Sequence, residues 1–218
     1  MIRDDFSGVG SPKPDVWVSL GSPKVADGML YLGTSGDGVR SKTKITLDDA
    51  ARVTVVVSNG SGAIYLTPYE VDTHPDTLVP RIPFYKISYR QSGNFYSVTI
   101  SNQDRTIASA YVILKLKILA KCSGNTINFI GVGKDEAGND VEVVIASFTN
   151  QFYNQNVALY LFGGATNIDY VEAGSGRELQ ATFFYESLMP VIMAIVPLVL
   201  LIAVIRTVLR SVKELGVH

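Results

Sequence analysis

Cysteine and histidine are nearly absent from this chain, which has Cys122 as its only cysteine and His74 and His218 as its only histidines. A single cysteine excludes an internal disulfide, and with it the small secreted modules that disulfides hold together, so the domain must be stabilised by its hydrophobic core. One cysteine and two histidines are also too few for a zinc site. The sequence therefore predicts neither a metal ion nor a cofactor.

Charge is scarce as well, because only 18% of the residues are charged and the net charge is −1. Without a global basic field, the chain is not expected to bind nucleic acid. Its 47% of hydrophobic residues argues against intrinsic disorder, because disordered chains are poor in such residues. The opening residues MIRDDFSGVG contain no apolar stretch, so no secretory signal peptide is visible.

What the chain does contain is a series of short segments rich in β-branched and aromatic residues, separated by turn sequences such as NGSG, QSGN, CSGN and EAGND. Tyr85, Ile87 and Tyr89 share one face of a predicted hairpin strand, and Lys86 and Arg90 share the opposite face. One buried face and one wet face predict an all-β fold of antiparallel strands packed as a two-sheet sandwich.

A long apolar run follows the predicted sandwich. From Leu188 to Ile205 the chain carries no charge, and at about 1.5 Å rise per residue this helix would be roughly 27 Å long. That length is close to the ~30 Å hydrocarbon core of a bilayer, so the run predicts one transmembrane helix rather than a buried core helix. Aromatic residues before it and basic residues after it are expected at the membrane surface: Phe183, Phe184, Tyr185, Arg206, Arg210 and Lys213.

The predicted organisation has four parts: a β-sandwich domain (1–174), a juxtamembrane linker (175–187), the transmembrane helix (188–205) and a basic C-terminal tail (206–218). The basic tail favours a cytoplasmic C-terminus, which would place the sandwich outside, although no signal peptide is visible to export it. Either a leader was removed, or the sandwich stays on the side where it is made.

The two ends of the predicted sandwich resemble the concanavalin A-like lectins and glucanases. The opening sequence DDFSG, then Trp17 and an Asp27-Gly28 turn, resembles the first strands of that superfamily. Residues 157–174, VALYLFGGATNIDYVEAG, resemble its last pair of strands. The resemblance implies a concanavalin A-like jelly roll in which the first and last strands pair, but a fold does not define a function.

Glucanases of this superfamily carry the pattern E-x-D-x-x-E, because retaining hydrolysis needs two carboxylates about 5–5.5 Å apart. Here Glu70 and Asp72 occupy the first two positions, and Pro75 stands where the second glutamate would be. His74 is the remaining candidate for the acid, but it lies in a proline-rich stretch that is typical of a loop leaving a strand. We therefore predict no catalytic residue and no enzyme activity.

Calcium would need several oxygen ligands close together, and one cluster offers them: Asp135, Glu136, Asn139 and Asp140. The spacing favours a hairpin turn, in which these residue types stabilise the backbone, over a metal site.

Two groups of residues are candidates for binding. Basic residues recur in pairs that would share one strand face, and neighbouring strands would join them into a stripe for an anionic lipid, glycan or protein: Lys42 and Lys44, Lys86 and Arg90, Lys115 and Lys117. The alternative is a solvated sheet face whose lysines protect its edges. Tyr69, Tyr153 and Tyr160 are candidates for stacking on sugar rings or anchoring a protein interface, the alternative being closure of the core.

Three functions fit these features. We favour a membrane-anchored, non-enzymatic virion structural protein, either a capsid-to-membrane linker or a spike, because the chain lacks a visible signal peptide and disulfides. The alternative is a cell-surface protein that binds carbohydrate or adheres to neighbours; a membrane-tethered glycoside hydrolase is disfavoured by the missing glutamate. The expected partners are the lipid bilayer of a virion membrane or cell envelope, neighbouring subunits in an oligomer that gains from avidity, and glycans under the alternative.

Overall fold

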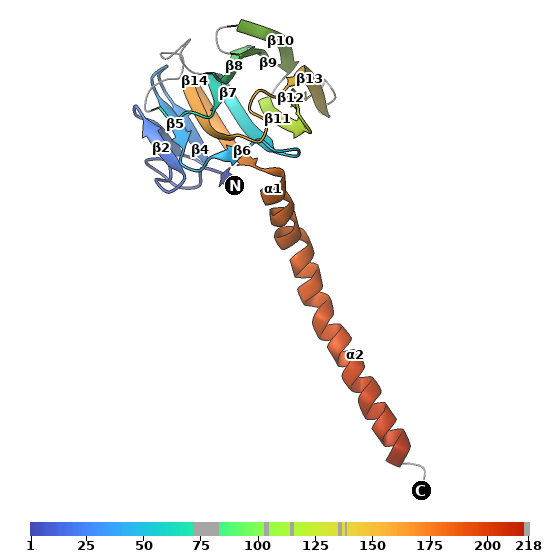
Figure 1. Ribbon diagram of the computed structural model, residues 1–218. Helices are drawn as coiled ribbons and strands as arrows, with labels where there is room; N and C mark the ends of the chain where they lie inside the picture. The colour runs from blue at the N-terminus through green and yellow to red at the C-terminus, as the bar shows by residue number, and fades with distance from the viewer. Residues whose placement is uncertain (72–82, 103–104, 114–115, 135–136, 138, 216–218) are drawn as a thin grey trace. The chain divides into compact units, whose positions relative to one another are not determined.

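A computed structural model describes residues 1–71, 83–102, 105–113, 116–134, 137 and 139–215. The chain divides into two compact units, Met1–Arg177 and Glu178–His218. The first unit consists mainly of antiparallel strands and the second is helical (Figure 1). The strands are β1 (Ile2–Asp4), β2 (Trp17–Leu20), β3 (Lys24–Ala26), β4 (Met29–Leu32), β5 (Gly38–Ser41), β6 (Ile45–Thr46), β7 (Arg52–Thr67), β8 (Tyr85–Ser92), β9 (Phe95–Asn102), β10 (Arg105–Ile113), β11 (Leu116–Ser123), β12 (Thr126–Lys134), β13 (Asp140–Thr149) and β14 (Asn156–Gly174). The helical elements are α1 (Gly176–Phe183), the π-helical segment η2 (Phe184–Leu188) and α2 (Met189–Leu215).

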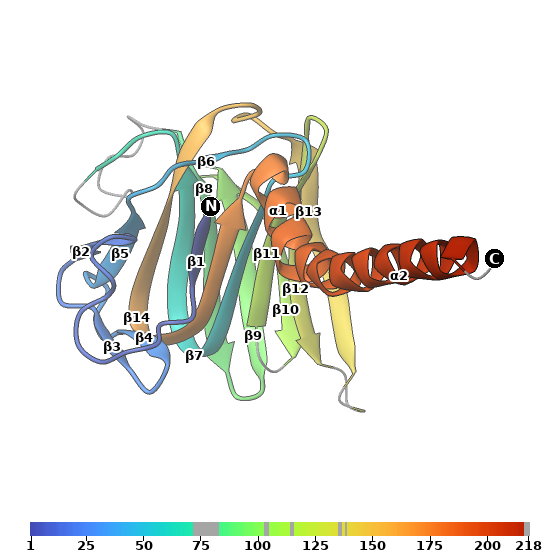
Figure 2. The same ribbon diagram turned by 90° about the horizontal axis from the view of Figure 1, so that it is seen from below.

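Two long strands, β7 and β14, form the centre of the first unit and run side by side (Figure 2). The first half of β7 pairs with β11, and its second half pairs with β8. In the same way, the first half of β14 pairs with β5, and its second half pairs with β4 and β1. Because each long strand changes its outer neighbour halfway along, one hydrogen-bonded network folds into two layers.

The first layer runs β10-β9-β8-β7-β14-β5-β2, and the second runs β13-β12-β11-β7-β14, with β1 and the β4–β3 pair beyond β14. Their facing side chains form one hydrophobic core. Val55, Ile64, Tyr85 and Phe129, which come from both layers, belong to this core and are at most 1% exposed. The predicted antiparallel two-sheet sandwich is confirmed.

QSGN and CSGN separate strands as predicted, whereas NGSG and the Gly-Gly within 157–174 bend two continuous strands. Gly60 has a φ of +91° in the middle of β7, and Ala165 has a φ of +64° in the middle of β14. The pairing between the two strands is irregular from Gly164 to Tyr170. Each kink turns its strand from one layer into the other, and the strand stays paired on both sides of the kink. The turn predicted at NGSG and the strand pair predicted within 157–174 are therefore wrong.

The DDFSG motif attaches the N-terminus to the body of the sandwich. Ile2 pairs with Ala173, so the first and last strands are neighbours, as the family resemblance implied. Asp4 is 1% exposed, and its carboxylate accepts hydrogen bonds from Phe6 N at 2.9 Å, Lys13 Nζ at 2.8 Å and Trp17 Nε1 at 2.8 Å. Hydrogen bonding to Asp4 raises the pKa of Lys13. Asp4 therefore connects the first strand to β2 through a buried polar cluster.

The C-terminal helices begin earlier than the sequence predicted. The linker expected at 175–187 is mostly helical, because α1 and η2 lead directly into α2. Gly176 N donates a hydrogen bond to Asp48 Oδ1 at 2.6 Å, and Glu178 lies in the first turn, where a negative charge stabilises the helix dipole. Pro197 lies inside α2, which nevertheless continues to Leu215.

Candidate functional site

The outer face of the first layer, which points away from the core, gathers polar and small residues from β9, β8, β7 and β14. Strand register places them in rows, since residues directly opposite in an antiparallel pair share a face. One row contains Ser97, Arg90, Ser61 and Gly164, and the next contains Thr99, Ser88, Ala63 and Phe162. A third row contains Ser101, Lys86, Tyr65, Tyr160 and Arg40.

An open hollow of about 310 Å³ lies on this face. Small residues form much of it, because glycine and alanine on β7 and β14 leave room that larger side chains would fill. Its lining residues are Ser35, Ser61, Gly62, Ala63, Tyr65, Lys86, Ser88, Tyr89, Arg90, Phe162, Gly163 and Gly164. The hollow thus combines apolar surface, hydroxyl groups and two cationic side chains, as a binding site for a polar ligand requires.

The charged side chains that line the hollow are both positive. Lys86 Nζ lies 5.4 Å from the centroid of the Tyr65 ring, a cation–π contact that holds the ammonium group over the aromatic face. Arg90 is exposed four residues further along β8. Among the described residues that line the hollow, none is acidic. The prediction that Lys86 and Arg90 share one wet strand face is confirmed.

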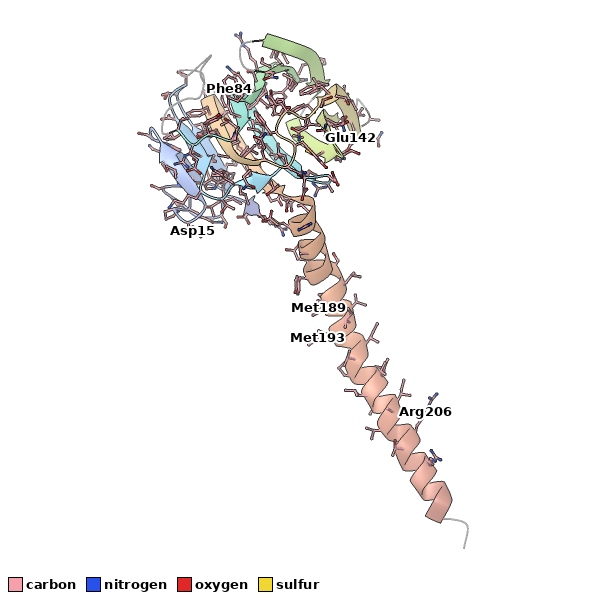
Figure 3. All side chains as sticks on the ribbon, viewed as in Figure 1. Asp15, Phe84, Glu142, Met189, Met193 and Arg206 are labelled. Atoms are coloured by element: carbon pink, nitrogen blue, oxygen red, sulfur yellow. The ribbon has the colours of Figure 1, made fainter. Side chains whose placement is uncertain are left out.

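A cluster of aromatic residues lies on the same outer face, beside the hollow. Tyr65, Tyr160 and Phe162 belong to it together with Phe84, which is labelled in Figure 3. Tyr65 and Phe84 meet edge to face with their ring centroids 5.5 Å apart, and Tyr160 and Phe162 stack at 6.3 Å. Residues 68–71 follow β7 as a covering segment, and Val71 packs against the cluster. These rings therefore form a small second core outside the sandwich.

Tyr160 attaches this covering segment to the sheet. Its hydroxyl accepts a hydrogen bond from Val71 N at 2.7 Å and lies 3.1 Å from the carbonyl oxygen of Tyr69. The side chain is 0% exposed, so the expected stacking of Tyr160 on a ligand is incompatible with its position. The sequence did not reveal this burial, because the covering segment precedes Tyr160 by almost ninety residues.

Glu70, the first carboxylate of the incomplete hydrolase motif, forms two ion pairs. One of its oxygens lies 3.0 Å from Arg40 Nη1 and the other lies 3.1 Å from Lys44 Nζ. Asp72, His74 and Pro75 lie outside the described residues. Glu70 therefore holds the covering segment against β5 and the chain that follows it.

The predicted basic stripe does not form from neighbouring strands. β8 and β11 both pair with β7, but with opposite halves of it, so Lys86 and Arg90 lie in a different layer from β11. Lys115 lies outside the described residues, as does the side chain of Lys117. Lys42 lies in a bend after β5 rather than on a strand. Of the predicted pairs, Lys86 and Arg90 alone are seen to line the hollow.

The other two predicted tyrosines lie away from the hollow. Tyr69 is 48% exposed in the segment after β7. Tyr153 is half-buried in the turn between β13 and β14, where its hydroxyl donates to Asp49 Oδ1, and this hydrogen bond raises the pKa of Tyr153. Neither lines the hollow. Their roles in binding stay predictions.

Sequence reasoning missed two glycines in the lining of the hollow, which allow close packing of β7 and β14 beneath it. A Cβ on Gly62 would lie 2.5 Å from Phe162 O, and one on Gly163 would lie 2.2 Å from Leu32 Cβ. The available signal was the position of these glycines inside strand-forming segments, which often marks a close approach of backbone or ligand.

Metal ligands do not gather among the described residues, where no three histidine, cysteine, aspartate or glutamate side chains are placed to hold an ion. β12 and β13 form the hairpin expected around the acidic cluster. Asp135 and Glu136 of that cluster lie outside the described residues.

The C-terminal unit contains one helix that is long and apolar enough to cross a membrane, considering the residues that the structure describes. It covers Tyr185–Thr207, and an 18-residue window within it has a mean hydropathy of 3.0. Apolar side chains such as Met189 and Met193 project from it, and Arg206 follows near the end of the apolar stretch (Figure 3). Tyr185 and Arg210 are also exposed; the side chains of Phe183, Phe184 and Lys213 lie outside the described part.

Comparison with known proteins gives matches of structure. No protein-family model and no curated protein sequence matches the chain. The exoplasmic/lumenal domain of VIP36, in a form with Ca²⁺ and Man2 bound, matches with a TM-score of 0.55 at 12% identity over 79% of this chain and 86% of that chain. Peanut lectin matches with a TM-score of 0.52 at 11% identity over 78% of this chain and 93% of that chain.

A β-glucanase of Bacillus licheniformis also matches, with a TM-score of 0.47 at 10% identity over 80% of this chain and 97% of that chain. The lectin matches, together with the pairing of the first and last strands, show that the first unit has the concanavalin A-like sandwich fold. At these identities the likeness defines the fold alone.

Proposed function

We propose that this chain is a membrane-anchored, non-enzymatic carbohydrate-binding protein of a cell envelope, which binds saccharide in the hollow on the outer face of β7, β8 and β14. The observation that carries the proposal is the composition of that face. It places the hydroxyls of Ser61 and Ser88, the donors of Lys86 and Arg90 and the small apolar side chain of Ala63 around one hollow. Sugars need both hydrogen-bond partners for their hydroxyls and apolar surface for their ring faces.

The row of hydroxyl side chains on β9 extends this surface beyond the hollow. Ser97, Thr99 and Ser101 lie opposite Arg90, Ser88 and Lys86, respectively. Hydroxyl groups both donate and accept hydrogen bonds, so they suit a ligand whose own groups do the same. The lectin fold supports the proposal as an analogy, because one VIP36 structure of that fold holds Man2.

Binding without catalysis is supported by the ion pairs of Glu70. Each of its carboxylate oxygens contacts a cation, Arg40 or Lys44, and these contacts hold the covering segment in place. A glycosidase needs a second carboxylate across the scissile bond, and Pro75 stands at that position in the motif. Oligosaccharides incubated with the chain should remain intact. Hydrolysis that is lost in Glu70→Gln would contradict the non-enzymatic proposal.

Anchoring is supported by the helix Tyr185–Thr207, whose apolar side chains are exposed in the isolated chain. A span with this hydropathy partitions into lipid, and the basic residues Arg206 and Arg210 fit a flank that contacts phosphate groups. We expect the full chain to stay with the membrane pellet after an alkaline carbonate wash and to enter solution only with detergent. Release by carbonate alone would show that the helix does not span the bilayer.

The virion role favoured by the sequence gains no support from the sandwich, the hollow or the comparisons, and it stays a prediction. Detection of the chain in purified virus particles, with the sandwich protected from added protease, would favour that role over a receptor on the cell surface. The oligomeric state and the domain boundaries at 174, 187 and 205 also stay predictions.

The binding proposal makes a direct prediction for Ser88, which lines the hollow. Ser88→Trp fills the hollow with a bulky ring, so saccharide binding should weaken at least about tenfold, the loss of roughly 1.4 kcal/mol. The measurement is binding of the full chain, in a polyoxyethylene detergent without sugar groups, to an array of neutral and acidic oligosaccharides.

The matched control is Ser147→Trp, which places the same ring on the exposed side of strand β13. This variant should bind as the unmodified chain does. Equal losses in the two variants, or no binding to any saccharide on the array, would refute binding in the hollow.

A further inference from the structure

One triplet of the chain has the sequence of an acceptor for N-linked glycans. Asn59-Gly60-Ser61 is the only place where asparagine is followed, after one residue other than proline, by serine or threonine. Attachment to the asparagine amide requires this hydroxyl residue at the third position. Such a triplet also fits a simple turn, so the surroundings of Asn59 in the fold decide between the two.

Asn59 lies at the surface of the sandwich, at the kink of β7. The residue is exposed, and the kink follows it directly at Gly60, where φ is +91°. Its backbone carbonyl oxygen accepts a hydrogen bond from Thr166 Oγ1 at 2.7 Å, but no described residue forms a hydrogen bond with its side chain. A sugar attached to Asn59 Nδ2 would therefore project into solvent and displace no hydrogen bond of the sandwich.

Other asparagine side chains of the sandwich are part of its structure. Asn150 is 3% exposed, and Asn102 exchanges two hydrogen bonds with Gln151, at 3.1 and 3.0 Å. The side-chain oxygen of Asn156 accepts a hydrogen bond from Thr46 Oγ1 at 2.7 Å. By contrast, the fold leaves the amide of Asn59 available for modification.

The folded backbone of the triplet is enclosed, so a transferase must reach it before the sandwich closes. Gly60 N donates a hydrogen bond to Gln91 Oε1 at 2.8 Å, and a Cβ on Gly60 would lie 1.9 Å from Ala165 O. Thr166, which bonds Asn59 from β14, comes 107 residues later in the chain. During synthesis the triplet therefore stays unpaired with β14 for about half the length of the chain, and a transferase can bind it in that interval.

The charges that flank the apolar helix favour a sandwich outside the cytosol. Arg206, Arg210 and Lys213 follow the apolar stretch, whereas Arg177 is the only basic residue between β14 and that stretch. Basic flanks of membrane helices stay on the cytoplasmic side. This rule assigns the C-terminus to the cytosol and the sandwich to the opposite side, where N-linked glycans are attached.

We propose that Asn59 carries an N-linked oligosaccharide, attached while the chain is being synthesised. The donor is an oligosaccharide linked to a polyprenyl diphosphate. Asn59 Nδ2 forms a bond to C1 of the first sugar, the bond between C1 and the diphosphate oxygen breaks, polyprenyl diphosphate leaves and the amide loses one proton. This inference rests on the proposed cell-envelope protein, with its sandwich outside the cytosol, and adds a modification site to it.

The test measures the mass of the full chain, purified in detergent from the membranes of the cells that produce it. We expect an intact mass above the 23.6 kDa of the polypeptide. Tandem mass spectrometry should place the added sugar units on the peptide that contains Asn59. An intact mass equal to that of the polypeptide, or sugars on other residues only, would overturn the inference.

Variants of the triplet, produced in the same cells, test the acceptor itself. Asn59→Gln and Ser61→Ala should each lose the added mass completely, whereas Ser61→Thr should keep it, because threonine supplies the same hydroxyl group. The matched control is Asn94→Gln, which changes an exposed asparagine outside the triplet and should keep the added mass. If Asn59→Gln fails to fold, the two Ser61 variants decide, and added mass that persists in Ser61→Ala would contradict the proposal.

Protease treatment of sealed membrane vesicles with their cytosolic side outward separates this inference from the function on which it rests. A sandwich that is protected but carries no sugar would overturn the glycosylation alone. A sandwich that is digested would overturn its placement outside the cytosol, and the glycosylation with it. Binding to the saccharide array is measured independently of both results.

Discussion

Replacing Gly60 with alanine should unfold or severely destabilise the sandwich. A Cβ at this position would lie 1.9 Å from Ala165 O and 2.6 Å from Thr166 Cα, and both are backbone atoms of β14 that cannot turn aside. The φ of +91° adds strain for any residue with a side chain. Overpacking of about 1–3 kcal/mol and backbone strain of about 1–2 kcal/mol together predict a loss of roughly 2–5 kcal/mol.

The measurement is urea unfolding of the full chain in detergent, followed by the fluorescence of Trp17, which is the only tryptophan and is 2% exposed. Gly124→Ala is the control, because Gly124 has a φ of +54° but a Cβ there would meet no atom within 4 Å. Strain alone should cost the control about 1 kcal/mol. Similar unfolding midpoints for the two variants would show that the two kinks do not pack as described.

Replacing Asp4 with alanine should have the second largest effect. The change leaves two buried donors, Phe6 N and Trp17 Nε1, without the carboxylate that accepts their hydrogen bonds, and it removes the ion pair with Lys13. An unsatisfied buried donor costs about 1–3 kcal/mol, so the two donors together predict a loss of roughly 3 kcal/mol.

The same urea titration measures this loss. Asp5→Ala is the matched control, since Asp5 is an exposed neighbour whose hydrogen bond to Ser7 N is also exposed, and its unfolding midpoint should barely move. If Asp4→Ala unfolds at the urea concentration of the unmodified chain, the polar cluster contributes nothing to stability and the motif has another role.

Local sequence patterns predicted the parts of the fold that depend on local contacts. In the hairpin of β8 and β9, the alternation of residues defined which side chains enter the core, and Tyr85, Ile87 and Tyr89 are all buried. The apolar run predicted the helix, whose apolar stretch covers Tyr185–Thr207. These features depend on residues within a few positions of one another, which a sequence displays directly.

Local patterns could not predict which strands pair when they lie far apart in the sequence. Glycine in the middle of β7 looked like a turn, because a kink that keeps its pairing on both sides depends on where β14 lies. Lys86 and Arg90 on β8 and Lys117 on β11 could not be assigned to different surfaces for the same reason, since β7 separates the two strands by pairing with each through a different half. The hollow itself combines β7, β8 and β14, which lie far apart in the sequence.

The pairing of the first strand with the last has a consequence for the order in which the molecule is made. β14 pairs with β1, β4, β5, β6 and β7, and it is synthesised after all the other strands. These strands therefore cannot complete their pairing until β14 has been made. Non-local pairing of this kind folds slowly, and unpaired strand edges stay open to other chains until it is complete. The apolar helix begins at Tyr185, eleven residues after β14 ends at Gly174. If the helix enters a bilayer as we propose, closure of the sandwich and insertion of the helix follow each other closely during synthesis. A variant that delays closure would then leave open strand edges on a chain that is entering the membrane.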